Sequence, residues 1–134
     1  MTNFVGSWKM DHTHNFDAVL HKLGINVIKR KLIESTKPVI TFKLDGNKMT
    51  MRTVSALKTT TISFTFDEEF DEETADGRKV KTKFTKESDS RITQVQTDSD
   101  NVTHTVREIN GDIMTTTATV GDVTAVNTYH KVDH

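Results

Sequence analysis

The hydrophobic side chains of this chain follow two different periods. From residue 15 to residue 36 they recur every three or four positions, the spacing that places them on one face of a helix. After Pro38 they recur at every second position, the spacing of a strand with one buried face. The pattern therefore predicts a short helical segment near the start of the chain, followed by a long run of strands.

Two short helices are expected within residues 15–36. The first has Asn15 in the N-cap position and Gly24 just beyond its last turn, and both residue types are common at such helix ends. The second begins after Asn26, another candidate N-cap. Because the connection between them is short, they are predicted to form a helix-turn-helix pair. The apolar positions expected on one face are Phe16, Val19, Leu20 and Leu23 in the first helix, and Ile28, Leu32 and Ile33 in the second.

The strands are marked by alternation and by polar turns between them. Alternating apolar positions include Ile40, Phe42, Leu44, Met49, Met51, Ile62, Phe64, Phe66, Val80 and Phe84. Turn sequences such as Asn110-Gly111 and Gly121-Asp122 follow at intervals of about ten residues, which is typical of an antiparallel up-and-down meander. Closing such a sheet into a barrel removes its exposed edges. We therefore expect residues 1–134 to form one all-β domain, an antiparallel β-barrel with a helical cap over residues 15–36.

Composition supports a sheet but not a solid apolar core. The chain has 23 Thr, 13 Val and 8 Ile, so 44 of its 134 residues are β-branched and favour strands. Hydrophobic residues make up only 34%. In the last three expected strands, VTHTVREI, IMTTTATV and VTAVNTYHK, polar residues occupy both faces. A barrel with a partly polar interior usually encloses a cavity that holds water or a ligand.

Charge and residue usage exclude several classes of protein. Lys plus Arg total 18 against 19 Asp plus Glu, which leaves no excess charge for binding nucleic acid. The chain has no Cys, which excludes a disulfide scaffold, a thiol nucleophile and a zinc-thiolate site. Its first residues carry no apolar leader, and no stretch of about 18 apolar residues occurs. A soluble, cytoplasmic protein is expected.

Metal binding and catalysis find little support in the sequence. His12 and His14 are two residues apart, but metal sites need three or four converging ligands, so neither a metal nor a cofactor is expected. Ser55 and Ser63 lie in no nucleophile motif, so the protein is not expected to be an enzyme. The acidic run at residues 67–73 lacks the register of a calcium loop and is expected to be a solvated loop.

The opening stretch GSWKMDHTHNFDAVLHKL resembles the N-terminal signature of the intracellular fatty-acid-binding proteins. The likeness continues through LDGNKMTMRTVSALKTTTISFTF, FDEETADGRKVKTKFTK, VREINGD and NTYHK, and VGDVTA with MTTTATV looks most like the members from parasitic flatworms. The resemblance implies a ten-stranded up-and-down barrel, also called a β-clam, around a water-filled cavity for one long-chain fatty acid of the palmitate or oleate type. It implies a noncatalytic carrier, with Trp8 in the core at the closed end.

The resemblance also implies how the ligand carboxylate is held. In the family two Arg and one Tyr usually hold it, the second Arg and the Tyr forming an Arg-x-Tyr motif on the last strand. Arg107 matches the first Arg and Tyr129 the Tyr, whereas Asn127 stands at the position of the second Arg. A neutral hydrogen bond is weaker than a charge-assisted one by about 1 kcal/mol or more. We therefore expect Arg107 to be the main anchor, with Tyr129 and bridging water completing the site.

The remaining expected site residues surround the acyl chain and its entrance. By resemblance they are Phe16, Leu20, Leu23, Ile33, Pro38, Ile40, Met51, Ser55, Leu57, Ala75 and Asp76. The basic residues Lys22, Lys29, Arg30 and Lys31 of the helical segment are a candidate patch for transient contact with anionic membranes. A monomer is expected. Retinoids, bile acids and heme are alternative ligands, and a lipid-acting enzyme or an interaction protein with a vestigial cavity are alternative functions.

Overall fold

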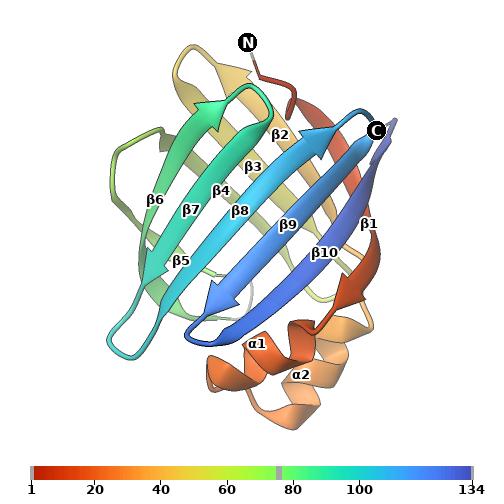
Figure 1. The fold of residues 1–134 in the computed structure, drawn as a ribbon, viewed down its shortest axis with the longest axis vertical. Helices are drawn as coiled ribbons and strands as arrows, with labels where there is room; N and C mark the ends of the chain where they lie inside the picture. Colours follow the sequence, from red (N-terminus) through yellow and green to blue (C-terminus); the bar gives the residue numbers. More distant parts are fainter. Residues whose placement is uncertain (1, 75–76, 134) are drawn as a thin grey trace.

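The computed structural model describes residues 2–74 and 77–133 of the chain. Ten antiparallel strands form one sheet in the order β4-β3-β2-β1-β10-β9-β8-β7-β6-β5 (Figure 1). Neighbours in the sheet are neighbours in sequence except where β1 pairs with β10, and this pairing bends the sheet into a nearly closed barrel. The predicted ten-stranded up-and-down barrel with a helical cap is confirmed. The strands are β1 (Gly6–His14), β2 (Val39–Asp45), β3 (Lys48–Val54), β4 (Thr59–Thr65), β5 (Phe70–Glu73), β6 (Lys79–Ser88), β7 (Arg91–Thr97), β8 (Val102–Asn110), β9 (Ile113–Val120) and β10 (Val123–Val132).

The two helices, α1 (Phe16–Lys22) and α2 (Val27–Glu34), lie together across one end of the barrel (Figure 1). At the start of α2 the side chain of Asn26 accepts a hydrogen bond from the Lys29 amide at 2.9 Å, the N-cap that the sequence predicts. Asn15 precedes α1 as predicted, but it does not cap the helix with its side chain. Its φ is 64°, and its amide donates instead to the Thr124 carbonyl at 2.9 Å. Asn15 thus ties the start of α1 to β10.

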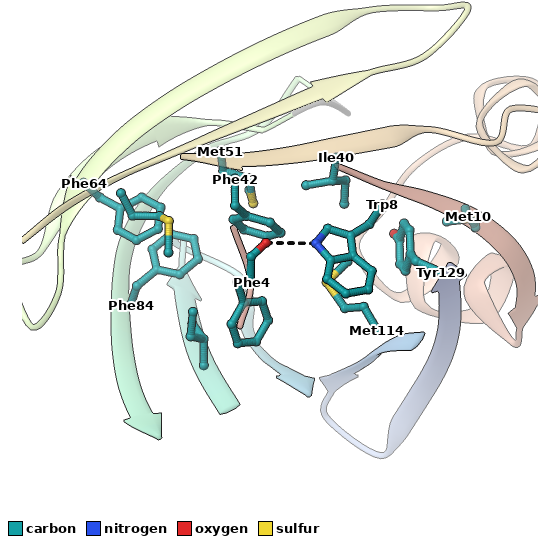
Figure 2. Close-up of a cluster of buried hydrophobic side chains, with 12 residues drawn as sticks. Phe4, Trp8, Met10, Ile40, Phe42, Met51, Phe64, Phe84, Met114 and Tyr129 are labelled. Atoms are coloured by element: carbon teal, nitrogen blue, oxygen red, sulfur yellow. Dashed lines mark hydrogen bonds between the residues drawn. The ribbon is translucent and has the colours of Figure 1, made fainter. Parts of the chain in front are cut away.

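A cluster of apolar side chains fills the barrel at the end away from the helices, which we call the closed end (Figure 2). Trp8 is fully buried in it, as expected, and its indole N–H donates to the Phe4 carbonyl at 2.9 Å. Phe64 and Phe84 stack with ring centroids 3.8 Å apart, and Phe4 meets Phe42 edge to face. Tyr129 lies at the edge of this cluster, on the side of the helices (Figure 2).

Helix α1 packs onto the sheet through a second, smaller cluster. Val19 is buried against Val120 of β9 and Ala125 of β10, and the partly buried Phe16 and Leu23 border them. None of the residues 27–34 of α2 is buried. Among the described residues, neither helix is long and apolar enough to cross a membrane. The cap is therefore held to the barrel mainly through α1.

Two expectations about local structure are wrong. Ile28 and Leu32 are 73% and 48% exposed, so the apolar positions of α2 do not share one inward face. They lie about 40° apart around the helix axis, whereas Ile33 is turned about 100° further and lines the interior. The acidic run also is not a solvated loop throughout, because its second half forms strand β5, which pairs with β6. The alternation of β5 places Asp71 and Glu73 outside the barrel and Glu72 inside.

Candidate ligand-binding site

A cavity of about 280 Å³ lies inside the barrel between the apolar cluster and the helices. It brings together side chains from both helices and from most strands. The predicted residues that line it are Phe16, Leu20, Leu23, Ile33, Pro38, Ile40, Met51, Ser55, Leu57, Arg107, Asn127 and Tyr129. The predicted residues Ala75 and Asp76 lie outside the described part of the chain. Residues from positions 16 to 129 thus converge on one enclosed space.

The side chain of Arg107 on β8 points into the barrel. On β8 the buried positions are Thr103 and Thr105, and Arg107 continues their face into the barrel. Its Nη1 donates to the side-chain oxygen of Gln94 on β7 at 2.7 Å. Its guanidinium carbon lies 5.9 Å from the centre of the Phe84 ring. Alternation along β8 alone left the direction open, because apolar residues occur on both of its faces.

Arg107 combines a buried charge with an unused donor. Burial lowers its pKa, while the neighbouring Tyr129 and Glu72 raise it. An arginine stays protonated in proteins, so the site keeps a positive charge. Among the described residues, the Arg107 Nε is buried without a hydrogen-bond partner. A buried donor without an acceptor is costly, and an anionic or strongly accepting group bound beside it would remove that cost.

Tyr129 and Asn127 follow each other on the inner face of β10. Tyr129 is 5% exposed, and burial raises the pKa of its hydroxyl, partly offset by the charge of Arg107. Its hydroxyl is therefore neutral and can donate. The side-chain oxygen of Asn127 accepts from the Thr13 hydroxyl, which leaves the amide N–H groups to face a ligand. Asn127 thus offers donors but no charge.

Several polar residues of the cavity were not predicted from the sequence. Glu72 of β5 accepts a hydrogen bond from the Thr82 hydroxyl at 2.6 Å and another from the Gln96 amide at 3.0 Å, both on its Oε1. Gln94, the partner of Arg107, lies two residues before Gln96 on the same face of β7. The signal was present as alternation in RITQVQT and FDEET, but glutamine and glutamate at inward positions look like surface residues.

The wall of the cavity nearest the helices is apolar and reaches the surface. Leu20 is buried beneath α1, and Ile40 and Met51 are buried on β2 and β3. Leu57, in the turn between β3 and β4, is 50% exposed although it also lines the cavity. The apolar lining therefore extends from the interior to the surface at this turn.

Charged groups join the two helices beside this opening. The Arg30 Nε of α2 lies 2.8 Å from the Asp17 carboxylate of α1, and its Nη1 donates to the Ile25 carbonyl at 2.7 Å. The hydrogen bond from Arg30 lowers the pKa of Asp17. Burial and the nearby Asp17 carboxylate raise the pKa of Glu34, which lines the cavity at the end of α2. The contact between Arg30 and Asp17 helps to hold α2 in place, although none of the residues of α2 is buried.

The described ranges 2–74 and 77–133 contain no group of three or more side chains that could together bind a metal ion. His130 meets Asp11 across β10 and β1 through its Nδ1. His12 and His14 are both exposed. The lining residues of the cavity offer hydrogen bonds and the charge of Arg107 on one side, and apolar contacts with Leu20, Ile40 and Met51 on the other.

Comparison with known proteins agrees with this geometry. The family model described as "Lipocalin / cytosolic fatty-acid binding protein family" matches residues 5–132. The fatty acid-binding protein type 3 of Fasciola hepatica is 71% identical over 132 residues, which is 98% of this chain and 100% of that protein. The structure of the Schistosoma mansoni fatty acid binding protein in complex with arachidonic acid superposes with a TM-score of 0.97 at 49% identity, covering 99% of this chain and 98% of that one. Fatty-acid-binding protein 1 of Echinococcus granulosus gives a TM-score of 0.92 at 36% identity, covering 96% and 97%. The chain therefore belongs to the lipocalin and cytosolic fatty-acid binding protein family.

Proposed function

We propose that this protein is a noncatalytic carrier that binds one long-chain fatty acid, of the palmitate or oleate type, inside the barrel and moves it through the cytoplasm as a monomer. The observation that carries the proposal is the buried guanidinium of Arg107, which has an unused donor and lines a cavity that also has an apolar wall. The fatty acid-binding names of the relatives, and the arachidonic acid in the complex of the Schistosoma mansoni protein, support the same ligand class.

In this proposal Arg107 receives the ligand carboxylate, and Tyr129 and Asn127 donate neutral hydrogen bonds to it. The acyl chain lies against the apolar wall formed by Leu20, Ile40 and Met51. Each methylene removed from water contributes about 0.8 kcal/mol, so the chain supplies most of the affinity. The head-group residues then select lipids by charge and shape rather than by hydrophobicity.

The test is titration of the lipid-free protein with oleate, together with native mass spectrometry. We expect one oleate per chain, bound reversibly and not converted. Arg107→Ala should weaken binding at least about ten-fold, since a hydrogen bond to a charged group is worth about 1.5–3 kcal/mol. Arg52→Ala is the matched control, because Arg52 is exposed on the outer face of β3. Equal affinity of the Arg107→Ala variant and the wild type would disprove the anchoring role.

We further propose that α2 contacts anionic membranes during ligand transfer. Its exposed Ile28 and Leu32 can enter the lipid interface, while Lys31 is attracted to anionic head groups. The variant Lys31→Gln should slow oleate transfer to anionic vesicles several-fold and leave transfer to zwitterionic vesicles nearly unchanged. Lys83→Gln, on the outer face of β6, is the control. Equal slowing with both kinds of vesicle would disprove a charge-dependent contact.

A further inference from the structure

We propose that Glu72 couples fatty-acid binding to proton uptake: when the carboxylate of a fatty acid enters the cavity, one proton from solution enters with it and is held between the ligand and Glu72. This inference rests on the proposed function, because it concerns how that same cavity receives its ligand. It identifies Glu72, outside the expected head-group residues, as the side chain that sets the charge of the bound state.

The carboxylate of Glu72 on β5 and the guanidinium of Arg107 on β8 are each bound by a glutamine of β7, and these two glutamines are neighbours on one face of that strand. Gln94 binds Arg107 and Gln96 binds Glu72, and these two glutamines occupy successive inward positions of β7. Successive positions on one face of a strand are about 7 Å apart. A carboxylate bound at Arg107 would therefore lie within strong electrostatic range of Glu72.

Three other charged side chains line the cavity, Arg78, Lys58 and Glu34, and each has a charged neighbour. Arg78 lies 3.3 Å from Asp98, and Lys58 lies 3.9 Å from Glu73. Glu34 stands next to Asp17, which is held by Arg30. The alternation of β6 directs Lys79 and Lys81 outward, where Lys81 meets Asp71. Apart from Arg78, Lys58 and Glu34, the described residues that line the cavity carry one cation, Arg107, and one carboxylate, Glu72.

Asn127 and Tyr129 add no charge to the interior of the cavity. Asn127 is neutral, and burial keeps the hydroxyl of Tyr129 protonated. The empty cavity is therefore balanced, with one positive and one negative charge. A second guanidinium at position 127 would give a surplus positive charge for the ligand to neutralise, but this chain lacks it.

Binding a fatty-acid anion would leave two carboxylates with one guanidinium in a space of low dielectric. Two carboxylates that share such a site do not both stay ionised, and one of them takes up a proton. The Oε1 of Glu72 receives its two hydrogen bonds from neutral donors, Thr82 and Gln96, which can also bind the protonated group. The proton thus replaces the charge that a second arginine would have supplied.

Proton uptake on binding determines how the dissociation constant of the fatty acid changes with pH. If the complex binds more protons than the separate partners, its dissociation constant rises as pH rises. Between pH 7 and 9 the free fatty acid is ionised, so uptake of one-half to one proton should raise the dissociation constant about three- to ten-fold per pH unit.

The experiment is calorimetric titration of the lipid-free protein with oleate at pH 7.4 in buffers of different ionisation enthalpy, such as phosphate and Tris. The dependence of the observed heat on buffer gives the number of protons taken up. We expect about one-half to one for the wild type and close to zero for Glu72→Gln, which removes the charge and keeps the shape. Glu73→Gln is the matched control, because it makes the same change one residue away on the outer face of β5. It should take up as many protons as the wild type.

Asn127→Arg provides a second test that leaves Glu72 in place, and it should also reduce proton uptake. Oleyl alcohol, which has the same chain and no carboxylate, should bind without uptake. If the wild type binds one oleate without taking up protons, or if Glu72→Gln takes up as many as the wild type, the inference is wrong while the carrier function stands. If no oleate binds to the wild type, the proposed function itself is wrong, and the inference with it.

Discussion

The closed end and the helix-capped end of the barrel are built on the same strands, yet their inward residues differ in kind. Going toward the helices along β6 to β10, the inner face changes from apolar to polar between two successive inward positions, whereas the inner face of β2 stays apolar. The changes are Phe84 to Thr82 on β6, Ile92 to Gln94 on β7, Ile109 to Arg107 on β8, Met114 to Thr116 on β9 and Tyr129 to Asn127 on β10. Cross-strand pairing of Ile109 with Met114 and of Arg107 with Thr116 brings the changes on β8 and β9 to one level. On β7 the change is one step further along, because Ile92 pairs with Arg107.

This boundary separates the side chains that stabilise the fold from those that line the cavity. Below the boundary, at the closed end, aromatic rings and methionines pack against one another and stabilise the fold. Above it, buried polar side chains surround a cavity, and not all of them are satisfied. A protein under selection for stability alone would gain by filling this space with apolar groups. The polar half is therefore the part of the barrel that contributes least to stability and is suited to hold a polar head group.

The largest expected effect on stability comes from removing a buried aromatic ring at the closed end. Phe42→Ala removes a ring that is 2% exposed and meets Phe4 edge to face at 5.6 Å. The free energy of unfolding should fall by about 3–5 kcal/mol, because a cavity replaces the ring. Urea unfolding of the lipid-free protein measures it, and oleate stoichiometry at low temperature should remain one per chain. Leu32→Ala, at an exposed position of α2, should change stability by less than about 0.5 kcal/mol.

A smaller effect should distinguish two buried threonines at the polar end. The Thr82 hydroxyl donates to Glu72 at 2.6 Å, whereas the Thr103 hydroxyl, which is also buried, has no partner among the described residues. Thr82→Val should lower the free energy of unfolding by about 1.5–3 kcal/mol, since it removes a hydrogen bond to a charged group. Thr103→Val should leave it unchanged or raise it by up to about 1 kcal/mol. Equal losses in the two variants would contradict the hydrogen-bond pattern of the cavity.

The sequence predicted the closed end better than the capped end, for a physical reason. Alternating apolar residues such as Ile40, Phe42 and Met51 signal burial directly, and turn residues mark the strand ends. The helices and the barrel followed from these signals, while the count of ten strands and the roles of Arg107 and Tyr129 came from the family resemblance.

Those polar residues of the interior that are of types usually found at the surface were not identified from the sequence. Glu72 lies in an acidic run, and only the pairing of β5 with β6 shows that it points inward. The direction of Arg107 likewise depended on cross-strand register rather than on its own strand. Asn15 stands at the predicted helix start but bonds to β10, because its left-handed backbone turns its side chain away from the helix. Such features depend on contacts between distant residues, which local patterns do not encode.

The smallest expected effect concerns the rim of the capped end, where Asp98 closes the turn between β7 and β8. Its carboxylate accepts from the amides of Asp100 and Asn101 at 2.8 and 2.7 Å, and it pairs with Arg78. These contacts, the Asp100 amide foremost, lower the pKa of Asp98 below its ordinary value of 3.8. A group whose pKa is lower in the folded state stabilises the fold above its unfolded pKa, and this contribution is lost as pH falls through the folded pKa.

Asp98→Asn should therefore lower stability at pH 7 by about 1 kcal/mol, and this difference should shrink as pH falls and the wild-type carboxyl takes up a proton. The measurement is urea unfolding of the lipid-free wild type and variant from pH 7 to pH 2. Asp122→Asn is the control, because that side chain is 90% exposed in the turn between β9 and β10. A difference between wild type and Asp98→Asn that stays constant down to pH 2 would mean that the shape of the turn, rather than the charge of Asp98, stabilises this end of the barrel.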